Sequence, residues 1–209
     1  MIKVLIADDH AVVRQGLKQI LADTPGIEAV AEAANGHEAL EKVRANNVDL
    51  VILDITMPGK SGLEALTEIK RERPQLPVLI LSVHGEEHYG MRVLRAGASG
   101  YLTKNSAPEE LVAAIKKALA GGKYVSAALA EKMAAGLVNS DTPLHERLSD
   151  REYQVLCLMA SGKMIKEIAE QMSLSVKTIS TYRSRILGKM GKHNSAELIH
   201  YAIQHGLVN

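Results

Sequence analysis

The first 120 residues alternate short apolar runs with longer amphipathic stretches, and this alternation restricts the fold more than any other feature. Short runs rich in Val, Ile and Leu predict strands, and apolar residues that recur every three or four positions predict helices. The expected strands are 2–7, 27–34, 50–54, 78–82 and 100–103. The expected helices lie near 11–22, 36–46, 62–72, 86–96 and 108–120. This order predicts an α/β domain with a five-stranded, parallel, doubly wound sheet that has helices on both faces.

The pattern changes at Gly121, where two glycines precede an Ala-rich segment and the turn residues Ser140–Pro143. We interpret 122–146 as a linker that contains one short helix over Ala127–Ala135. From residue 147 onward the apolar spacing is helical throughout, with helices expected near 150–160, 165–172, 176–190 and 195–205. The sequence thus predicts an α/β domain at 1–121 and a small all-α, four-helix domain at 147–209.

Composition argues against several classes of protein. The longest stretches without Asp, Glu, Lys or Arg contain 12 residues, whereas a membrane-spanning helix needs about 20 apolar residues. The start of the chain does not have the pattern of a signal peptide, so we expect a cytoplasmic protein with no membrane partner. The single cysteine, Cys157, cannot form an internal disulfide. Trp and Phe are absent, which argues against binding single-stranded nucleic acid by aromatic stacking.

The distribution of charge is more informative than the net charge of +1. Residues 1–121 carry 14 basic and 16 acidic groups, whereas residues 146–209 carry 9 basic and 6 acidic groups. Within 177–192 there are five basic groups and no acidic one. Such a stripe is either a solvated helix face or the electrostatic footprint of a DNA-binding element, and charge alone does not decide between them.

Polar side chains follow four of the expected strands of the first domain. Asp8 and Asp9 follow the first strand, Asp54 and Ser82 end the third and fourth, and Lys104 follows the fifth. Because the carboxyl ends of parallel strands meet at one edge of the sheet, these groups should lie together. Clustered carboxylates repel one another, and Mg²⁺ is the cation that such an oxygen site prefers. Asp54 is then a candidate nucleophile that forms an aspartyl phosphate, with the metal and the lysine stabilising phosphoryl charge.

This set of motifs resembles the receiver domain of two-component response regulators over all of residues 1–120. The motifs are Asp8-Asp9, Asp54 with Met57-Pro58-Gly59, Ser82, and Tyr101-Leu102-Thr103-Lys104. The resemblance implies that Asp54 is the phosphoacceptor and that Asp8 and Asp9 form the acidic Mg²⁺ pocket. It also implies that the main-chain carbonyl of Thr56 is a further metal ligand.

The same resemblance assigns three residues to the response to phosphorylation. Ser82 and Tyr101 fill the switch positions, and Lys104 contacts the phosphoryl group. This chain departs from the family pattern at Asn105, where many receivers have a proline that follows a cis peptide bond.

Other chemistry is less compatible with these residues. Aspartyl phosphatases of the haloacid dehalogenase type also use an Asp nucleophile, but they usually place a second Asp where this chain has Thr56. No nucleotide-binding glycine motif is present. His84 and His88 are four residues apart without the HExxH pattern of zinc enzymes, so we interpret them as surface histidines. A DNA-binding protein that is independent of phosphorylation is the remaining alternative.

The segment 176–190 has two distinct faces if it forms one helix. Ile179, Tyr182, Ile186 and Met190 fall on one side at helical spacing. Small, polar and basic residues fall on the opposite side, which allows close approach of the backbone to base edges and contact with phosphates. The helix near 165–172 and the short turn that follows it would complete a helix-turn-helix.

Residues 147–209 resemble the LuxR-type DNA-binding domain through the strings LSDREYQVL, KEIAEQMSLSVKTISTYRSRILGKM and AELIHYAIQHGL. The resemblance makes 176–190 the recognition helix. It places near the bases Lys177, Ser180, Thr181 and Ser184. It places near phosphates Thr178, Tyr182, Arg185 and Lys189. The class often has His where this chain has Tyr182. It also often has Ser-Asn where this chain has Met164-Ile165, so this chain lacks the usual N-cap of the helix that precedes the recognition helix.

Together the two resemblances identify the chain as similar to response regulators of the NarL/FixJ class. They imply a transcription regulator whose Asp54 is phosphorylated by a sensor histidine kinase in the presence of Mg²⁺. Phosphorylation would repack the receiver around Tyr101 and promote formation of a homodimer on double-stranded promoter DNA, with RNA polymerase as a further partner. The receiver would act as an enzyme only in the gain and loss of its own phosphate.

Overall fold

A computed structural model describes residues 1–131 and 143–208, except for the side chains at positions 87 and 88. The chain divides into two compact units, the first of which ends at Glu131. Residues 122–131, which the sequence places in the linker, therefore belong to the first unit. Residues 127–131 are helical, and the rest of the helix expected over Ala127–Ala135 lies outside the described residues.

The first unit is a five-stranded parallel sheet in the order β2-β1-β3-β4-β5. The strands are β1 Ile2–Ala7, β2 Ile27–Ala33, β3 Leu50–Asp54, β4 Val78–Ser82 and β5 Gly100–Thr103. The helices between and after them are α1 Ala11–Ala22, α2 Gly36–Ala45, α3 Gly62–Glu72, α4 Glu86–Arg95 and α5 Pro108–Leu119. The predicted α/β fold class and the predicted order of elements are confirmed.

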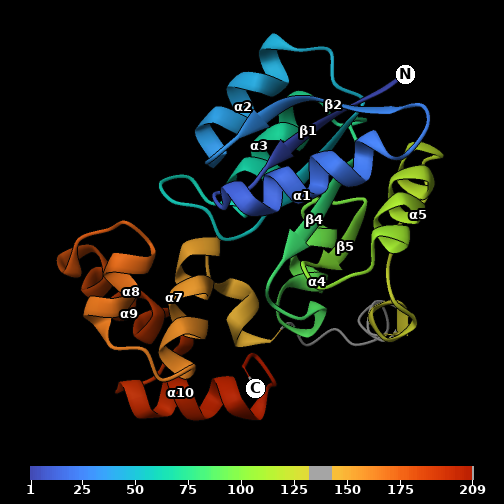
Figure 1. Cartoon of the computed structure of the whole chain (residues 1–209). Coiled ribbons are helices and arrows are strands. Elements are labelled where there is room, and N and C mark those ends of the chain that lie inside the picture. The colour runs from blue at the N-terminus through green and yellow to red at the C-terminus, as the bar shows by residue number, and fades with distance from the viewer. Residues whose placement is uncertain (132–142, 209) are drawn as a thin grey trace. The chain divides into compact units, whose positions relative to one another are not determined.

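Both faces of the sheet are covered by helices (Figure 1). Alternate strand residues such as Val4, Ile52 and Leu79 belong to one buried cluster with Leu17 of α1 and Ile115 of α5. The intervening residues of β1, β3 and β4, such as Leu5, Leu53 and Ile80, are equally buried on the opposite face. Strands buried on both sides read as continuous apolar runs, which explains why the sequence identifies them so clearly.

The segment after α5 continues the sheet beyond β5. Tyr124 forms a parallel bridge with Gly100, and its carbonyl accepts a hydrogen bond from the main-chain nitrogen of Tyr101 at 3.2 Å. A side chain at Gly100 would collide with Tyr124, because a β-carbon there would lie 2.6 Å from the Tyr124 carbonyl oxygen. Farther along, the buried side chain of Leu129 fills the space over Gly90 in α4.

Over its described residues, 143–208, the second unit contains the 3₁₀ helix η1 and four α-helices around one small core. Their bounds are η1 Leu144–Arg147, α7 Asp150–Ala160, α8 Ile165–Gln171, α9 Val176–Met190 and α10 Ser195–Gln204. Each of these α-helices contributes a fully buried side chain, namely Val155, Ile168, Ile179 and Leu198. The four predicted helices are confirmed, and none of the described helices is long and apolar enough to cross a membrane.

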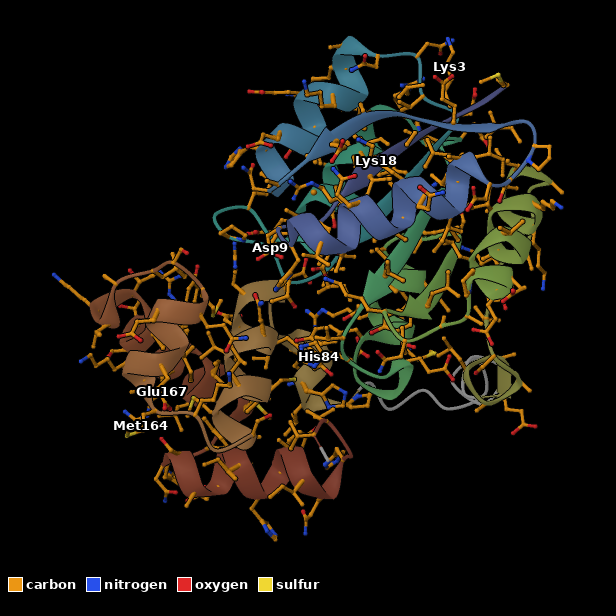
Figure 2. The ribbon with its side chains drawn as sticks, viewed as in Figure 1. Lys3, Asp9, Lys18, His84, Met164 and Glu167 are labelled. Carbon is orange, nitrogen blue, oxygen red and sulfur yellow. The ribbon has the colours of Figure 1, made fainter. Side chains whose placement is uncertain are left out.

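Local capping explains where the helices of this unit begin. Ser149 and Glu152 form a capping box at the start of α7, and Ser175 and Asn194 accept hydrogen bonds at the starts of α9 and α10. At α8 the N-cap is Met164, whose main-chain nitrogen donates to the Glu167 carboxylate at 2.7 Å; Figure 2 labels both residues. Glu167 therefore supplies its half of a capping box, although Met164 has no side-chain oxygen with which to supply the other half.

Candidate functional site

The carboxyl ends of β1, β3 and β5 bring together three of the predicted site residues. The Lys104 ammonium lies 2.7 Å from Oδ2 of Asp54 and 2.7 Å from Oδ2 of Asp8. The side chains of both aspartates are 2% exposed. The main-chain nitrogen of Thr56 donates to Oδ1 of Asp54 at 3.1 Å, which fixes the orientation of the Asp54 carboxylate. One lysine cation therefore bridges two buried carboxylates from different strands.

The backbone that carries Asp54 is held tightly by the start of α3. The Gly62 nitrogen donates to the Ile55 carbonyl at 2.9 Å. A β-carbon on Gly62 would lie 1.7 Å from the Asp54 carbonyl oxygen. Only glycine allows this approach, so α3 braces the strand at the residue that presents the carboxylate.

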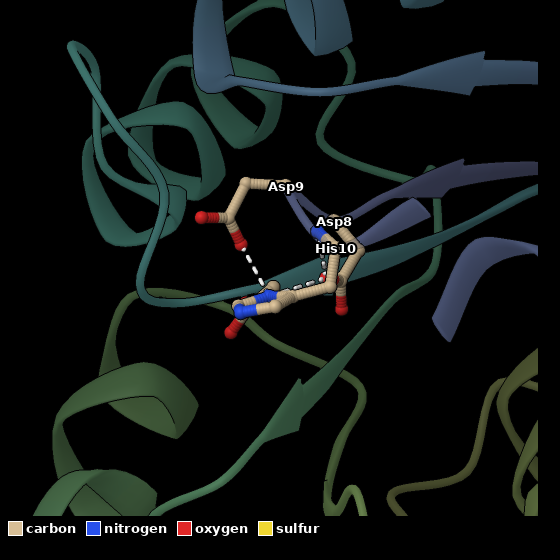
Figure 3. A group of neighbouring side chains, drawn as sticks. Asp8, Asp9 and His10 are labelled. Atoms are coloured by element: carbon tan, nitrogen blue, oxygen red, sulfur yellow. Dashed lines mark hydrogen bonds and ion pairs between the residues drawn. The ribbon is translucent and has the colours of Figure 1, made fainter. Parts of the chain in front are cut away.

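Asp9 and His10 complete the group at the end of β1 (Figure 3). Asp8, Asp9, His10 and Asp54 each offer one ligand atom, and these atoms all lie within 4.8 Å of one another. Carboxylate oxygens are the donors that Mg²⁺ prefers, and the 31% exposure of Asp9 leaves room for coordinated water. The donor set therefore fits the expected Mg²⁺. The structure places Thr56 at this site through its nitrogen, and the role of its carbonyl stays a prediction.

Burial and charge act in opposite directions on the two central groups. Burial raises the pKa of the Asp54 carboxyl to about 6, and the hydrogen bond from Lys104 limits the rise. Burial lowers the pKa of Lys104, but its hydrogen bonds to Asp54 and Asp8 outweigh this effect and raise the pKa above its ordinary value. At neutral pH Asp54 is thus mainly a carboxylate, which is the nucleophilic form.

The predicted switch residues lie on β4, which pairs with the strand of Asp54, and on β5, the next strand beyond it. Ser82 is fully buried, and its hydroxyl accepts a hydrogen bond from the His84 nitrogen at 3.1 Å. The Tyr101 ring is already buried at 4% exposure, and its hydroxyl donates to the His84 carbonyl at 2.8 Å. The main chain at His84, which Figure 2 labels, thus contacts both switch residues. The His84 ring packs 5.5 Å from that of Tyr89, and the side chain of His88 lies outside the described part.

In the second unit α9 has the two faces that the sequence predicts. Ile179, Ile186 and Met190 are buried, and Tyr182 is half-buried beside them. The opposite face is exposed at Lys177, Thr181, Ser184 and Arg185, with Ser180 and Thr178 half-buried at its margins. The turn between α8 and α9 is tight, and Ser173 in it has φ 54°. The result is a helix-turn-helix with a polar and basic outer surface.

Two basic residues of α9 are engaged within the unit. The Lys189 ammonium, expected near phosphates, lies 2.6 Å from the carboxylate of buried Glu152 in α7. Arg183 donates to the Ser195 hydroxyl at 2.6 Å and so ties α9 to α10. Sequence reasoning missed Glu152, although its place in the capping box after Ser149 is visible in the sequence.

Comparison with known proteins identifies both units. Residues 4–116 match the response regulator receiver domain family, and residues 146–202 match the luxR family of bacterial regulatory proteins. The chain is 42% identical over 212 residues to the response regulator UvrY of Escherichia coli, with 100% of this chain and 97% of that protein covered. The chain is a response regulator of the NarL/FixJ class.

Other relatives of this response regulator agree over its full length. The response regulator GacA of Pseudomonas aeruginosa is 37% identical, with 100% of this chain and 99% of that protein covered. RcsB from Salmonella enterica serovar Typhimurium, solved bound to promoter rprA in the presence of phosphomimetic BeF3⁻, has a TM-score of 0.64 and 29% identity. The match covers 96% of this chain and 98% of that chain. The receiver domain and the LuxR-type domain expected from the sequence are therefore confirmed.

One departure from the family pattern is also resolved. Within the described residues there is no cis peptide bond, so the Lys104–Asn105 bond is trans.

Proposed function

We propose that this response regulator accepts a phosphoryl group on Asp54 from a phosphohistidine of a sensor histidine kinase. The proposal rests on the buried Asp54 carboxylate, whose Oδ2 lies 2.7 Å from the Lys104 ammonium beside Asp8 and Asp9. This arrangement offers a nucleophile and a fixed cation at one sheet edge, which is what phosphoryl transfer to a carboxylate requires.

In the proposed transfer an Asp54 carboxylate oxygen attacks phosphorus while the phosphorus–nitrogen bond of the kinase breaks. The histidine nitrogen keeps the electron pair of that bond and takes up a proton. Lys104 neutralises charge on the phosphoryl oxygens. Mg²⁺, held by Asp8, Asp9, Asp54 and the Thr56 carbonyl, would supply further electrostatic stabilisation when bound. Attack of water on phosphorus later restores the carboxylate, so the only turnover is that of the protein's own phosphate.

The new phosphoryl group adds a charge of about −1.5 to −2 near neutral pH. Ser82 and Lys104 are the groups placed to contact it. The His84 main chain bonds to Ser82 and to Tyr101, so a shift of Ser82 changes the contacts of the tyrosine. We infer that phosphorylation shifts the population between two packings of this region and favours a homodimer.

The proposed output is binding of the dimer to double-stranded promoter DNA through the outer face of α9. The residues of that face proposed near bases are Lys177, Ser180, Thr181 and Ser184. Those proposed near phosphates are Thr178, Tyr182, Arg185 and Lys189, the last of which also forms an ion pair with Glu152. Regulation of promoters places the protein in the cytoplasm and makes RNA polymerase a further partner.

Phosphorylation is tested with acetyl phosphate and Mg²⁺, followed by mass spectrometry of the intact chain. The wild type should gain one phosphoryl group and Asp54→Asn should gain none. Asp23→Asn is the matched control, because the Asp23 carboxylate is exposed and accepts hydrogen bonds from Gln19, four residues earlier in the chain. Equal incorporation by wild type and Asp54→Asn would refute the assignment.

The DNA face is tested by measuring binding of the phosphorylated protein to promoter fragments across salt concentrations. Loss of a phosphate contact in Arg185→Ala should reduce the slope of log K against log salt by about 0.9. Gln204→Ala, exposed on α10, should leave affinity and slope unchanged. An unchanged slope for Arg185→Ala would remove that residue from the proposed interface.

A further inference from the structure

His10 adds a nitrogen donor to the acidic pocket (Figure 3). Its main-chain nitrogen donates to Oδ1 of Asp8 at 2.8 Å. Its ring Nδ1 lies 2.7 Å from Oδ1 of Asp9 and 3.3 Å from Oδ1 of Asp8. The imidazole therefore sits against two of the carboxylates that form the proposed magnesium pocket.

The helix that follows does not account for the position of this ring. His10 is the N-cap residue of α1, yet its side chain makes no capping hydrogen bond. The side chain is 63% exposed, so the ring is free to turn about its χ angles toward the pocket without disturbing the core. Its contacts are with the carboxylates of Asp8 and Asp9.

The pocket has the charge and the spacing of a mixed oxygen and nitrogen site. The ligand atoms of Asp8, Asp9, His10 and Asp54 lie within 4.8 Å of one another. Opposite ligands of an ion with bonds of about 2.0–2.2 Å lie about 4.0–4.4 Å apart, so a small inward movement of these side chains would let them share one ion. The three carboxyl groups of Asp8, Asp9 and Asp54 outnumber the one Lys104 ammonium that bridges two of them. Magnesium uses oxygen donors, whereas imidazole suits nickel, copper and zinc.

We propose that His10 is a metal ligand that makes this pocket bind a first-row transition-metal ion such as Ni²⁺ in competition with Mg²⁺. The inference rests on the proposed function only in using the same pocket. Affinity for Ni²⁺ generally exceeds that for Mg²⁺ at mixed-donor sites, so tight Ni²⁺ binding alone is not diagnostic. The diagnostic quantity is therefore the decrease in Ni²⁺ affinity relative to Mg²⁺ affinity when the imidazole is removed.

The experiment is isothermal titration calorimetry of the full chain with Mg²⁺ and, separately, with Ni²⁺. His10→Gln keeps a side chain that can bond to Asp9 but removes the imidazole nitrogen. It should weaken Ni²⁺ binding by about tenfold or more and change Mg²⁺ binding by less than about twofold. His37→Gln, exposed on α2, is the matched control and should change neither. Asp9→Asn should weaken both ions, because they share the pocket.

The outcomes separate this inference from the proposed function. Unchanged Ni²⁺ affinity in His10→Gln, or an equal loss for both ions, would overturn the assignment of His10 as a ligand. Loss of Mg²⁺ but not Ni²⁺ binding in Asp9→Asn would place Ni²⁺ elsewhere and would also overturn it. A wild type that binds Ni²⁺ through His10 but does not bind Mg²⁺ would support the inference and refute the magnesium pocket.

Discussion

The contact between Gly62 and the strand that carries Asp54 makes a sharp prediction for Gly62→Ala. The added β-carbon would lie 1.7 Å from the Asp54 carbonyl oxygen and 2.7 Å from its carbonyl carbon. Real β-carbons essentially never approach closer than 3.0 Å, so the start of α3 and the end of β3 must separate by about 1.3 Å, the difference between 3.0 and 1.7. Both colliding groups belong to the backbone, so no side-chain rotation relieves the contact.

The energetic cost follows from this displacement. Overpacking of a dense interior costs about 1–3 kcal/mol, and weakening of the Gly62–Ile55 hydrogen bond adds about 1 kcal/mol. We expect Gly62→Ala to lower the free energy of unfolding of the receiver by about 3 kcal/mol. The same separation moves Asp54 relative to Lys104, so phosphorylation by acetyl phosphate should slow as well.

Gly16→Ala is the matched control for this substitution. Gly16 lies exposed within α1. Apart from its chain neighbours and the backbone of its own helix, no atom of the described residues lies within 4 Å of the position of an added β-carbon. Alanine in a helix interior should stabilise the protein by about 0.5–1 kcal/mol. Urea unfolding of both variants and the rate of phosphorylation are the measurements. A Gly62→Ala protein as stable and as reactive as the wild type would refute the steric argument.

Two further predictions concern the second unit. Ser173→Gly should stabilise it by up to about 1 kcal/mol, because φ 54° is left-handed backbone that glycine adopts without strain; urea unfolding checks this, and a loss of stability would contradict it. Burial alone would raise the pKa of Glu152, but hydrogen bonds from Lys189 and Ser149 hold it below its usual 4.5. The pair therefore stabilises the fold above the unfolded pKa and loses this effect as pH falls through the folded pKa. Lys189→Met should cost about 2 kcal/mol at neutral pH and should reduce the fall in melting temperature that the wild type shows as the pH drops below about 4.5; an unchanged dependence of the melting temperature on pH would exclude the pair.

The sequence predicts most of the fold because the signals are local. Each strand of the first unit is an apolar run, and the apolar stripe through Ile179 and Ile186 fixes the buried face of α9. The convergence of Asp8, Asp54 and Lys104 was also predictable, since parallel strands end at the same edge of the sheet.

The features that the sequence did not predict depend on partners far apart in the chain. Lys189 belongs to a basic stripe by sequence, yet its partner Glu152 lies 37 residues earlier. Tyr124 follows a pair of glycines and shows no strand periodicity, and only the vacant side-chain position at Gly100 allows its bridge. Leu129 is buried because Gly90, on another helix, leaves room for it. Hydrophobic patterns and secondary-structure propensities describe neighbouring residues, so they do not predict contacts between distant ones.

The segment around Tyr124, which pairs with β5, determines where the receiver can be cut to give an isolated fragment. It covers part of the hydrogen-bonding edge of β5, which would otherwise be a template for pairing with another polypeptide. A fragment cut at residue 121, where helix α5 has ended, would expose that edge together with the apolar slot over Gly90. Fragments that extend through residue 131 keep both surfaces covered and should be less prone to aggregate.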